Sequence, residues 1–409
     1  MQNALAKGAR PSLPDLAFTL SRANEAGAAA GGQPTATLAL VATSLEDLQT
    51  KLVVALESLM NSTGVRVTDP RGIYFSEQPL AREAKLAFLF PGQGSQYVDM
   101  LRDLAINFVE VQEQFERADH ALKGTLPKPL SAYIYPPPSF SQEEEQARRE
   151  ALTQTNVAQP AMGAAGLAVF HLLDRLGVHP DFVAGHSYGE YVALCAAGVF
   201  REDELFALSE ARGRFMVAAA GEEPGAMAAV EAGPEAVRQM LAGVPGLVLA
   251  NHNAPKQTII AGARSALEGA IEDFKKAGIR VWPIPVACAF HSPIVAPAQP
   301  RLAEFLSSME LREPSVEVFS NTTAAPHSHD PGAIAAQLVE HVVQPVRFAD
   351  EVEALYATGA RIFVEVGPRN VLSGLTDQIL GDRPHLAVAT DQPGRSDRKS
   401  TRLNSSHER

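Results

Sequence analysis

The sequence predicts an α/β protein with a mostly parallel sheet, helices on both faces of that sheet, and a smaller subdomain inserted into it. Two observations lead to this prediction. From residue 85 to residue 392, short apolar segments alternate with longer segments of helical periodicity, which is typical of parallel sheets. Within that region, residues 223–286 follow the order strand, helix, strand, strand, helix, strand, which predicts a ferredoxin-like subdomain. We therefore expect a large subdomain made of residues 85–222 and 287–392.

Residues 1–84 precede this pattern and are expected to form a small α/β module and linker. A short helix is expected around residues 16–21. The run at 35–42 predicts a strand, and apolar residues at helical spacing predict a helix over 44–59. Residues 62–84 are polar and are expected to be extended. No residue of this module is a candidate for catalysis or ligand binding.

The large subdomain owes its strands to short, continuous apolar runs, as expected for strands buried on both faces. These strands are expected at residues 86–90, 181–184, 316–320 and 361–366. Helical periodicity or composition predicts helices at 98–122, from 143 onward, and at 155–176, 190–197, 203–219, 298–309, 331–343, 348–358 and 371–380.

The inserted subdomain is expected to have four strands and two helices. The strands are expected at 225–230, 247–251, 257–262 and 280–285, and the helices at 235–241 and 265–277. Residues 393–409 are polar and charged without periodicity, so we expect a disordered tail outside the fold.

Composition narrows the class of protein. The 409 residues carry a net charge of −12, which argues against a nucleic-acid-binding surface and against affinity for anionic membranes. The two cysteines lie in apolar contexts, so no disulfide framework is expected and a cytoplasmic location fits best. No apolar run reaches membrane-spanning length, and the N-terminus has no signal-peptide pattern.

The most informative motif is Gly-His-Ser-Tyr-Gly at residues 185–189. It lies between a predicted strand and a predicted helix, where the pattern G-x-S-x-G forms a sharp turn that exposes a serine hydroxyl. Gly185 and Gly189 leave room where the strand and helix come close. The helix N-terminus directs N–H groups toward a developing oxyanion. Ser187 is therefore the candidate nucleophile.

A serine nucleophile needs a base, and the chain has eleven histidines. His186 is adjacent to Ser187, but neighbours across such a turn point apart. His291 is the best candidate because it follows a strand and a short apolar run. No acidic residue stands out as a third member, so a dyad in which a backbone carbonyl orients His291 is expected.

Two further features allow either a structural or a functional interpretation. Gly92-Gln93-Gly94 follows the strand at 86–90 and forms either an ordinary turn or a loop that presents Gln93 to a ligand. Arg212 and Arg214 lie either on a solvated helix face or in a clamp for a substrate carboxylate. No cluster has metal-ligand spacing, and no phosphate-binding or dinucleotide fingerprint is present.

Together these motifs resemble the malonyl-CoA:acyl-carrier-protein acyltransferase family. The matching segments, over about residues 85–390, are FPGQGSQ (90–96), GHSYGE (185–190), Arg212, AFH (289–291) and EVGP (365–368). Residues 10–84 resemble the ketosynthase-to-acyltransferase linker of a type I polyketide synthase. Residues 136–161 are similar to iterative synthases of the enediyne and polyunsaturated-fatty-acid kind. The resemblance implies an α/β-hydrolase-like large subdomain.

The resemblance also implies a role for each candidate residue. Ser187 would form the acyl-enzyme, and His291 would act first as general base and then as general acid. The remaining implied roles are an oxyanion hole from the Gln93 and Tyr188 N–H groups, a carboxylate partner in Arg212, a His291-orienting carbonyl in Gln344, and selection against an α-methyl group by Phe290.

The resemblance implies transfer of a malonyl unit from malonyl-CoA to the phosphopantetheine thiol of an acyl carrier protein. The implied partners are that carrier and the ketosynthase and other domains of a parent synthase. No bound cofactor, metal, nucleic acid or membrane is implied. Two alternatives remain: a serine hydrolase or proofreading thioesterase, and a non-catalytic docking module.

Overall fold

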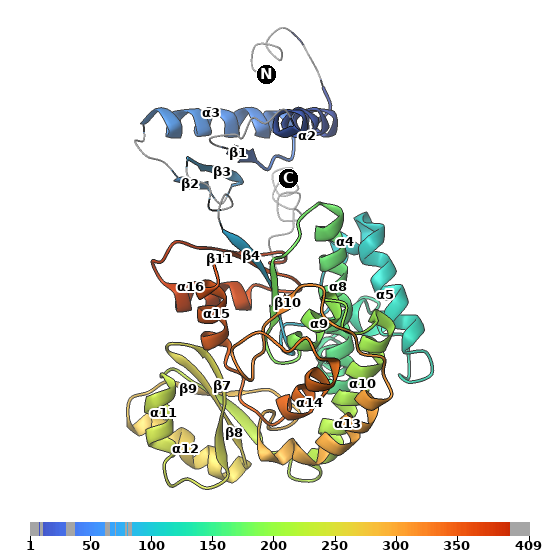
Figure 1. Cartoon of the computed structure of the whole chain (residues 1–409), viewed down its shortest axis with the longest axis vertical. Helices are drawn as coiled ribbons and strands as arrows, with labels where there is room; N and C mark the ends of the chain where they lie inside the picture. Colours follow the sequence, from blue (N-terminus) through green and yellow to red (C-terminus); the bar gives the residue numbers. More distant parts are fainter. Residues whose placement is uncertain are drawn as a thin grey trace. The chain divides into compact units, whose positions relative to one another are not determined.

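The computed structural model describes residues 8, 11–29, 37–61, 66–69, 71–77, 80 and 84–392. The chain divides into two compact units, Met1–Glu83 and Ala84–Arg409 (Figure 1). The tail expected to be disordered, 393–409, lies outside the described residues. Within the described residues, no helix is both long enough and apolar enough to cross a membrane.

Among its described residues, the first unit contains helices α2 (Leu13–Ala29) and α3 (Leu45–Asn61) and a small antiparallel sheet. The strands, in the order β1-β3-β2, are β1 (Thr37–Leu40), β2 (Arg66–Asp69) and β3 (Ile73–Ser76). Helix α2 is longer than the sequence predicted. The polar stretch expected only to be extended contains the β2–β3 pair.

The second unit is built on a five-stranded sheet in which every pair is parallel. The strand order is β10-β5-β4-β11-β12. The bounds are β4 (Lys85–Phe90), β5 (Phe182–Gly185), β10 (Glu317–Val318), β11 (Ala360–Glu365) and β12 (Leu386–Ala389). The parallel sheet predicted from the sequence is thus confirmed.

Alternate residues of the central strand β4 enter two different cores. Phe88 and Phe90 belong to one buried apolar cluster, and Ala87 and Leu89 to another. Helices cover both faces of the sheet: α8, α9 and α10 lie on one side and α15 and α16 on the other (Figure 1). Burial on both faces explains why β4 is an uninterrupted apolar run in the sequence.

The described helices of this unit follow the predicted order, but one predicted helix is divided in two, and two short helices (Ser131–Ile134 and Pro293–Ala298) were not predicted. Their bounds are α4 (Arg102–Asn107), α5 (Val109–Ala121), α6 (Ser131–Ile134), α7 (Gln142–Thr153), α8 (Thr155–Arg175), α9 (Gly189–Ala196), α10 (Glu202–Ala220), a 3₁₀ helix (Pro293–Ala298), α13 (Gln299–Ser307), α14 (Pro331–His341), α15 (Phe348–Ala357) and α16 (Val371–Leu380). The single helix predicted over 98–122 is wrong. Leu101 has a φ of 55° and Phe108 is extended, so the segment forms two helices, α4 and α5.

The inserted subdomain has the predicted ferredoxin-like order. Its elements are β6 (Ala226–Val230), α11 (Pro234–Leu241), β7 (Leu247–Ala254), β8 (Gln257–Gly262), α12 (Arg264–Lys276) and β9 (Val281–Ile284). The four strands pair antiparallel in the order β7-β8-β6-β9. Helices α11 and α12 lie on the same face of this sheet (Figure 1).

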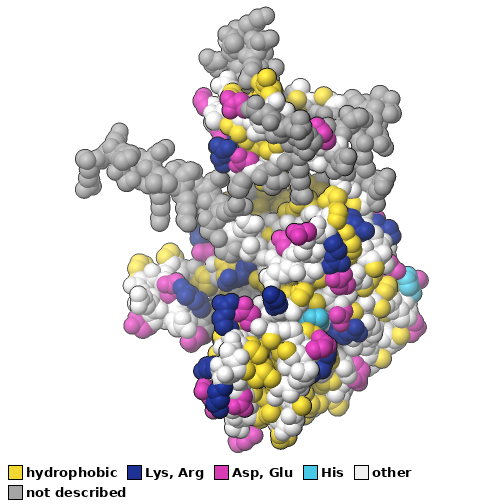
Figure 2. Space-filling view, turned by 90° about the vertical axis from the view of Figure 1, so that its left-hand side faces the viewer, with side chains coloured by type: hydrophobic (Ala, Val, Ile, Leu, Met, Phe, Trp, Pro, Cys, Tyr) yellow, Lys and Arg dark blue, Asp and Glu magenta, His cyan; other side chains and the backbone are white. Residues whose placement is uncertain are grey.

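Charged side chains of both signs are interspersed on the surface. Figure 2 shows acidic, basic and apolar side chains mixed over one face of the molecule. The net charge of −12 therefore does not form a continuous acidic patch on that face. Any site for an anionic ligand must be built from local groups.

Candidate active site

The turn between β5 and α9 holds Ser187 in a strained conformation. Its φ is 52°, in the left-handed region that costs a non-glycine residue about 1–3 kcal/mol. The two flanking positions have no room for a side chain, so both must be glycine. A Cβ at Gly185 would lie 2.1 Å from the Gly189 carbonyl carbon, and one at Gly189 would lie 1.9 Å from the Phe90 carbonyl oxygen. The sharp turn predicted from the motif is therefore present.

His291 lies within hydrogen-bond distance of the serine, although 104 positions separate them in the sequence. Its Nε2 is 2.7 Å from Ser187 Oγ. Its Nδ1 lies 2.9 Å from the Gln344 carbonyl oxygen and 3.2 Å from that of His341. Because carbonyl oxygens only accept, Nδ1 carries the proton and Nε2 is free to accept the serine proton.

The surroundings of His291 keep its imidazole neutral. The side chain is buried, and burial holds its pKa well below the usual value, with further contributions from His341 and Arg212. Both effects disfavour the protonated form. A neutral imidazole is the form that a general base needs at neutral pH.

Gln93 and Tyr188 present backbone N–H groups from two different elements. Gln93 follows β4, and α8 holds its side chain because the amide lies 3.4 Å from both Thr155 and Gln159. Tyr188 precedes α9, and its hydroxyl lies 2.6 Å from Ser209 Oγ. Within the described residues, neither backbone N–H has a hydrogen-bond acceptor. Both remain available for an oxyanion.

Arg212, on α10, is a buried cation. The side chain is only 2% exposed, and its Nε has no hydrogen-bond partner among the described residues. The guanidinium lies 4.8 Å from the centre of the Tyr191 ring, a cation–π contact. None of the carboxylates in the described part of the chain lies within ion-pair distance of it. Arg214, by contrast, pairs with Glu210 at 3.1 Å and is largely exposed, so the two arginines differ in environment.

These groups line one pocket of about 310 Å³ between the large and the ferredoxin-like subdomains. Ser187, His291, Gln93 and Arg212 all contribute to its wall, as does the half-buried Phe290. The opposite wall comes from the inserted subdomain through Met227, Asn251, Asn253, Ile259 and Ile284. The structure thus brings the predicted residues Gln93, Ser187, Tyr188, Arg212, Phe290 and His291 together around one cavity. Gln344 is not part of its wall but contacts His291.

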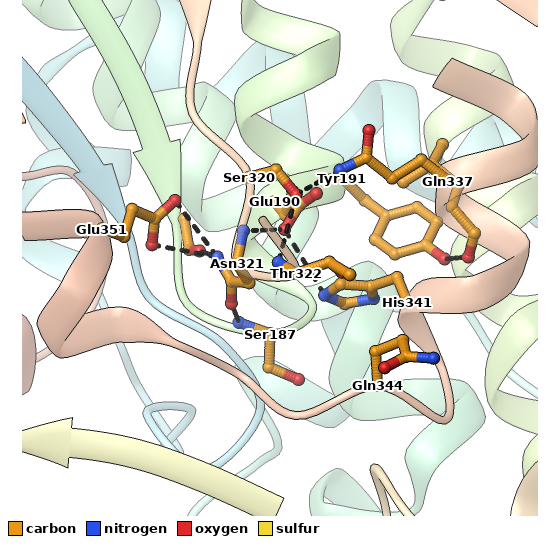
Figure 3. Close-up of polar contacts among 12 residues, drawn as sticks. Ser187, Glu190, Tyr191, Ser320, Asn321, Thr322, Gln337, His341, Gln344 and Glu351 are labelled. Carbon is orange, nitrogen blue, oxygen red and sulfur yellow. Dashed lines mark hydrogen bonds and ion pairs between the residues drawn. The ribbon is translucent and has the colours of Figure 1, made fainter. Parts of the chain in front are cut away.

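Asn321, which was not among the residues predicted from the sequence, forms hydrogen bonds with both sides of the turn that carries Ser187 (Figure 3). Its Oδ1 accepts a hydrogen bond of 2.5 Å from the Ser187 N–H. Its Nδ2 donates to the Gly185 carbonyl and to the Glu351 carboxyl group at 3.1 Å. An amide can accept from one side of the turn and donate to the other. Asn321 follows β10, the strand beside β5, and its position at that sheet edge was the signal available.

Two buried carboxyl groups complete this network (Figure 3). Glu190 accepts from the Asn321 N–H at 2.8 Å and pairs with His327 at 2.7 Å. Burial raises the pKa of Glu190, but His341, His327 and the Asn321 N–H outweigh it, so the pKa is lowered. Burial and the charge of Glu190 together raise the pKa of Glu351 well above its usual range. Glu190 is thus the ionised member and Glu351 the neutral one.

No group of three or more His, Cys, Asp or Glu side chains in the described residues is arranged to hold a metal ion. The chemistry that the pocket itself offers is nucleophilic. A serine with a neutral histidine base, two N–H donors and a separate buried cation can transfer an acyl group that carries a negative charge.

The chain belongs to the acyl transferase domain family, whose model matches residues 87–395. A polyunsaturated fatty acid synthase protein of a Thraustochytrium species is 33% identical over 331 residues, which are 79% of this chain and 12% of that protein. The malonyl CoA-acyl carrier protein transacylase of Bacillus subtilis is 37% identical over 316 residues, which are 76% of this chain and 94% of that protein.

A solved structure resembles more of the chain than the second unit alone. The acyltransferase domain from the second module of the salinomycin polyketide synthase superposes with a TM-score of 0.74 and 31% identity. The match covers 96% of this chain and 90% of that one. The similarity therefore extends into Met1–Glu83. The chain is an acyltransferase with homologues among both free-standing transacylases and synthase domains.

Proposed function

We propose that this chain transfers malonyl units from malonyl-CoA to the phosphopantetheine thiol of an acyl carrier protein. The observation that carries the proposal is the buried Arg212 guanidinium, which lines the pocket of Ser187 and His291 and has no carboxylate partner among the described residues. A buried cation is costly unless it is paired. The free carboxylate of a malonyl group would supply the missing partner through bidentate hydrogen bonds.

In the first half-reaction, the Ser187 hydroxyl attacks the thioester carbonyl while His291 Nε2 takes the serine proton. The Gln93 and Tyr188 N–H groups stabilise the oxyanion, and each such donor contributes about 3–4 kcal/mol. Collapse of the tetrahedral intermediate breaks the C–S bond. His291 returns the proton to the departing CoA thiolate, and malonyl-Ser187 remains.

In the second half-reaction, the carrier thiol replaces CoA. His291 accepts the thiol proton, the sulfur attacks the malonyl ester, and the Ser187 oxygen leaves with the proton from His291. The Gln344 carbonyl keeps Nδ1 protonated throughout, so no carboxylate partner is needed. The proposed reaction uses no resident cofactor.

Phe290 lies in the pocket wall directly before His291. A bulky side chain at this position fills the space that an α-methyl group would need, which supports malonyl over methylmalonyl. Rejection of a single methyl group amounts to about 1–3 kcal/mol.

We further propose that residues 1–84 are a ketosynthase-to-acyltransferase linker and that the chain functions within a cytoplasmic synthase. The relative from Thraustochytrium is a synthase subunit of which the match covers 12%, and the salinomycin domain comes from a module of a polyketide synthase. Both similarities support a polyketide or polyunsaturated-fatty-acid synthase with ketosynthase and carrier domains as partners.

The test is incubation with radiolabelled malonyl-CoA, with and without holo carrier protein, followed by peptide mapping. Stable label on Ser187 that moves to the carrier supports transfer. Rapid release of free malonate from the wild type would favour the hydrolase alternative. A folded protein that takes up no label would refute both. Ser187→Ala is the control that identifies the labelled residue.

A further inference from the structure

A second cavity, of about 760 Å³, adjoins the pocket of Ser187. The two share the wall residues Gly94, Gln96, Thr153 and Pro285. The proline-rich stretch before α7 and the helix α7 form much of its remaining wall. The proposed mechanism uses neither segment. Four arginines line it: Arg102, Arg148, Arg149 and Arg369.

Three of these arginines are already paired with acidic side chains. Arg102 lies 3.3 Å from Asp99, and Arg149 pairs with Glu145. Arg148 lies 3.8 Å from Glu144 and donates to the carbonyls of Pro137 and Pro138, which fastens α7 to the preceding stretch. The acidic partners therefore largely neutralise the positive charge that these three arginines could offer to a ligand.

Arg369 differs from the other three arginines in its ion pairing. In the described part of the chain, no carboxylate lies within ion-pair distance of its guanidinium. Its Nε donates to the Ser95 carbonyl at 3.2 Å, and the guanidinium lies 5.4 Å from the centre of the Tyr97 ring. The residue is only partly exposed. This cavity thus contains a partly buried cation with no carboxylate partner among the described residues. Arg212, which is fully buried, is the corresponding cation of the catalytic pocket.

The backbone of Arg369 is also strained. Its φ is 72°, a conformation that costs a non-glycine residue about 1–3 kcal/mol. Asp391 holds it there, because one carboxylate oxygen accepts both the Arg369 N–H at 3.0 Å and the Tyr97 hydroxyl at 2.6 Å. Glycine would adopt this backbone without strain. An arginine at this position places a guanidinium at the cavity.

We propose that the arginine-lined cavity binds the phosphate of a phosphopantetheine thioester, with Arg369 as the principal ligand. This inference rests on the proposed function. When the thioester lies at Ser187, the pantetheine arm must leave through adjoining space, and its far end carries a phosphate in both CoA and the carrier protein. Guanidinium groups match phosphate oxygens in charge and geometry. The net charge of −12 makes such a local cation important for an anionic substrate.

The test compares wild type with Arg369→Gly, a substitution that removes the guanidinium and suits the backbone. The matched control is Arg238→Ala on α11, which removes an exposed, paired arginine outside the cavity. In the donor arm, acylation of Ser187 is measured with malonyl-CoA and with malonyl-pantetheine, which lacks phosphate. In the acceptor arm, malonyl transfer is measured to holo carrier protein and to free pantetheine.

Arg369→Gly is expected to lower kcat/KM about 10-fold for phosphate-bearing substrates, mainly through KM, since it removes a charge-assisted hydrogen bond. The phosphate-free substrates should react as with wild type. A phosphate-dependent loss in the donor arm alone would show that the site binds CoA. A loss in the acceptor arm alone would show that it binds the carrier protein's phosphopantetheine. A loss in both arms would show that it binds the phosphate that the two substrates share.

Equal effects on substrates with and without phosphate, or no effect in either arm, would overturn the inference. Failure of the proposed function is a separate result, since wild type would then either take up no malonyl group from malonyl-CoA or malonyl-pantetheine, or release it to water as malonate instead of passing it to a thiol. The melting temperature of Arg369→Gly should stay close to that of wild type, because relief of backbone strain opposes the loss of the Ser95 hydrogen bond and the larger unfolded-state entropy of glycine. An unchanged melting temperature separates lost binding from lost folding.

Discussion

The environment of Arg212 distinguishes it from the arginine two positions later on the same helix. Arg214 is exposed and paired with Glu210, whereas Arg212 is buried beside Tyr191 and faces the pocket of Ser187. Burial removes the water that would otherwise solvate the charge. A substrate carboxylate can therefore contribute far more here than at the surface.

Arg212→Ala should lower kcat/KM for malonyl transfer about 100-fold or more, because it removes two charge-assisted hydrogen bonds. Acetyl transfer should fall far less, since acetyl has no carboxylate. Acylation rates with malonyl-CoA and acetyl-CoA measure the ratio, and Arg214→Ala is the matched control. Equal losses for both acyl groups would refute the clamp.

The buried environment of His291 predicts the acid limb of the pH profile. Its folded-state pKa lies well below the usual 6.5, so the neutral base persists as the pH falls through 6.5 and is lost only at lower pH. Acylation kcat/KM measured against pH should therefore keep its plateau below pH 6.5. An acid limb centred at or above 6.5 would show that the imidazole is not desolvated in solution.

Asn321 is expected to act on the reaction by positioning Ser187. Asn321→Ala removes the acceptor of the Ser187 N–H and the donor to Gly185. The acylation kcat should fall about 10- to 100-fold with little change in KM, since misplacing a reacting group by 1 Å can cost that much. A change confined to KM, or to the melting temperature alone, would contradict a positioning role.

Glu351→Gln provides the matched comparison for Asn321. Because the pKa of Glu351 is raised well above its usual range, an uncharged glutamine resembles the form already present. It also keeps an oxygen to accept from Asn321 Nδ2. Near wild-type kcat is expected.

At the scale of elements, the turn between β5 and α9 depends on close backbone packing. Helix α9 approaches β4 so closely that only a hydrogen fits at Gly189. The contact joins the nucleophile turn to the strand that ends at the Gln93 loop. It therefore fixes the distance between the serine and one oxyanion donor.

Gly189→Ala should destabilise the protein by about 2 kcal/mol or more, because its Cβ would overlap the Phe90 carbonyl. Gly374→Ala, in helix α16, meets no atom within 4 Å and should be neutral or stabilising by up to about 1 kcal/mol. Denaturant unfolding of the two variants measures the difference. Similar unfolding free energies would contradict the close packing at the turn.

Elements with strong local patterns were predictable, and weakly patterned ones were not. The continuous apolar runs of β4 and β11 and the order of the ferredoxin-like elements are visible in the sequence. Strand β12 was missed because Leu386–Ala389 is a short, partly exposed edge strand. The break at Phe108 was missed because it is a change of backbone angle within a helical pattern.

At the scale of the whole molecule, some site residues could be predicted from the sequence and others could not. Ser187 lies in a local motif, and His291, Gln93 and Arg212 could be singled out from their places in the chain. The resemblance to a known family added Tyr188, Gln344 and Phe290 and the role of each residue. Asn321, Glu190 and Glu351 were missed because their roles depend on contacts between residues 30 to 134 positions apart. Asn321 belongs to no recognisable motif, and only the parallel pairing of β10 with β5 brings it behind the nucleophile.

The central claim is that the acyl group on Ser187 is malonyl and is delivered to a carrier thiol. Its most direct measurement is a single-turnover chase of isolated malonyl-Ser187 enzyme, followed by intact-protein mass spectrometry. We expect the adduct to persist in buffer, and we expect holo carrier protein to remove it and gain one malonyl group. Loss of the adduct to water at the same rate with and without carrier would contradict the claim.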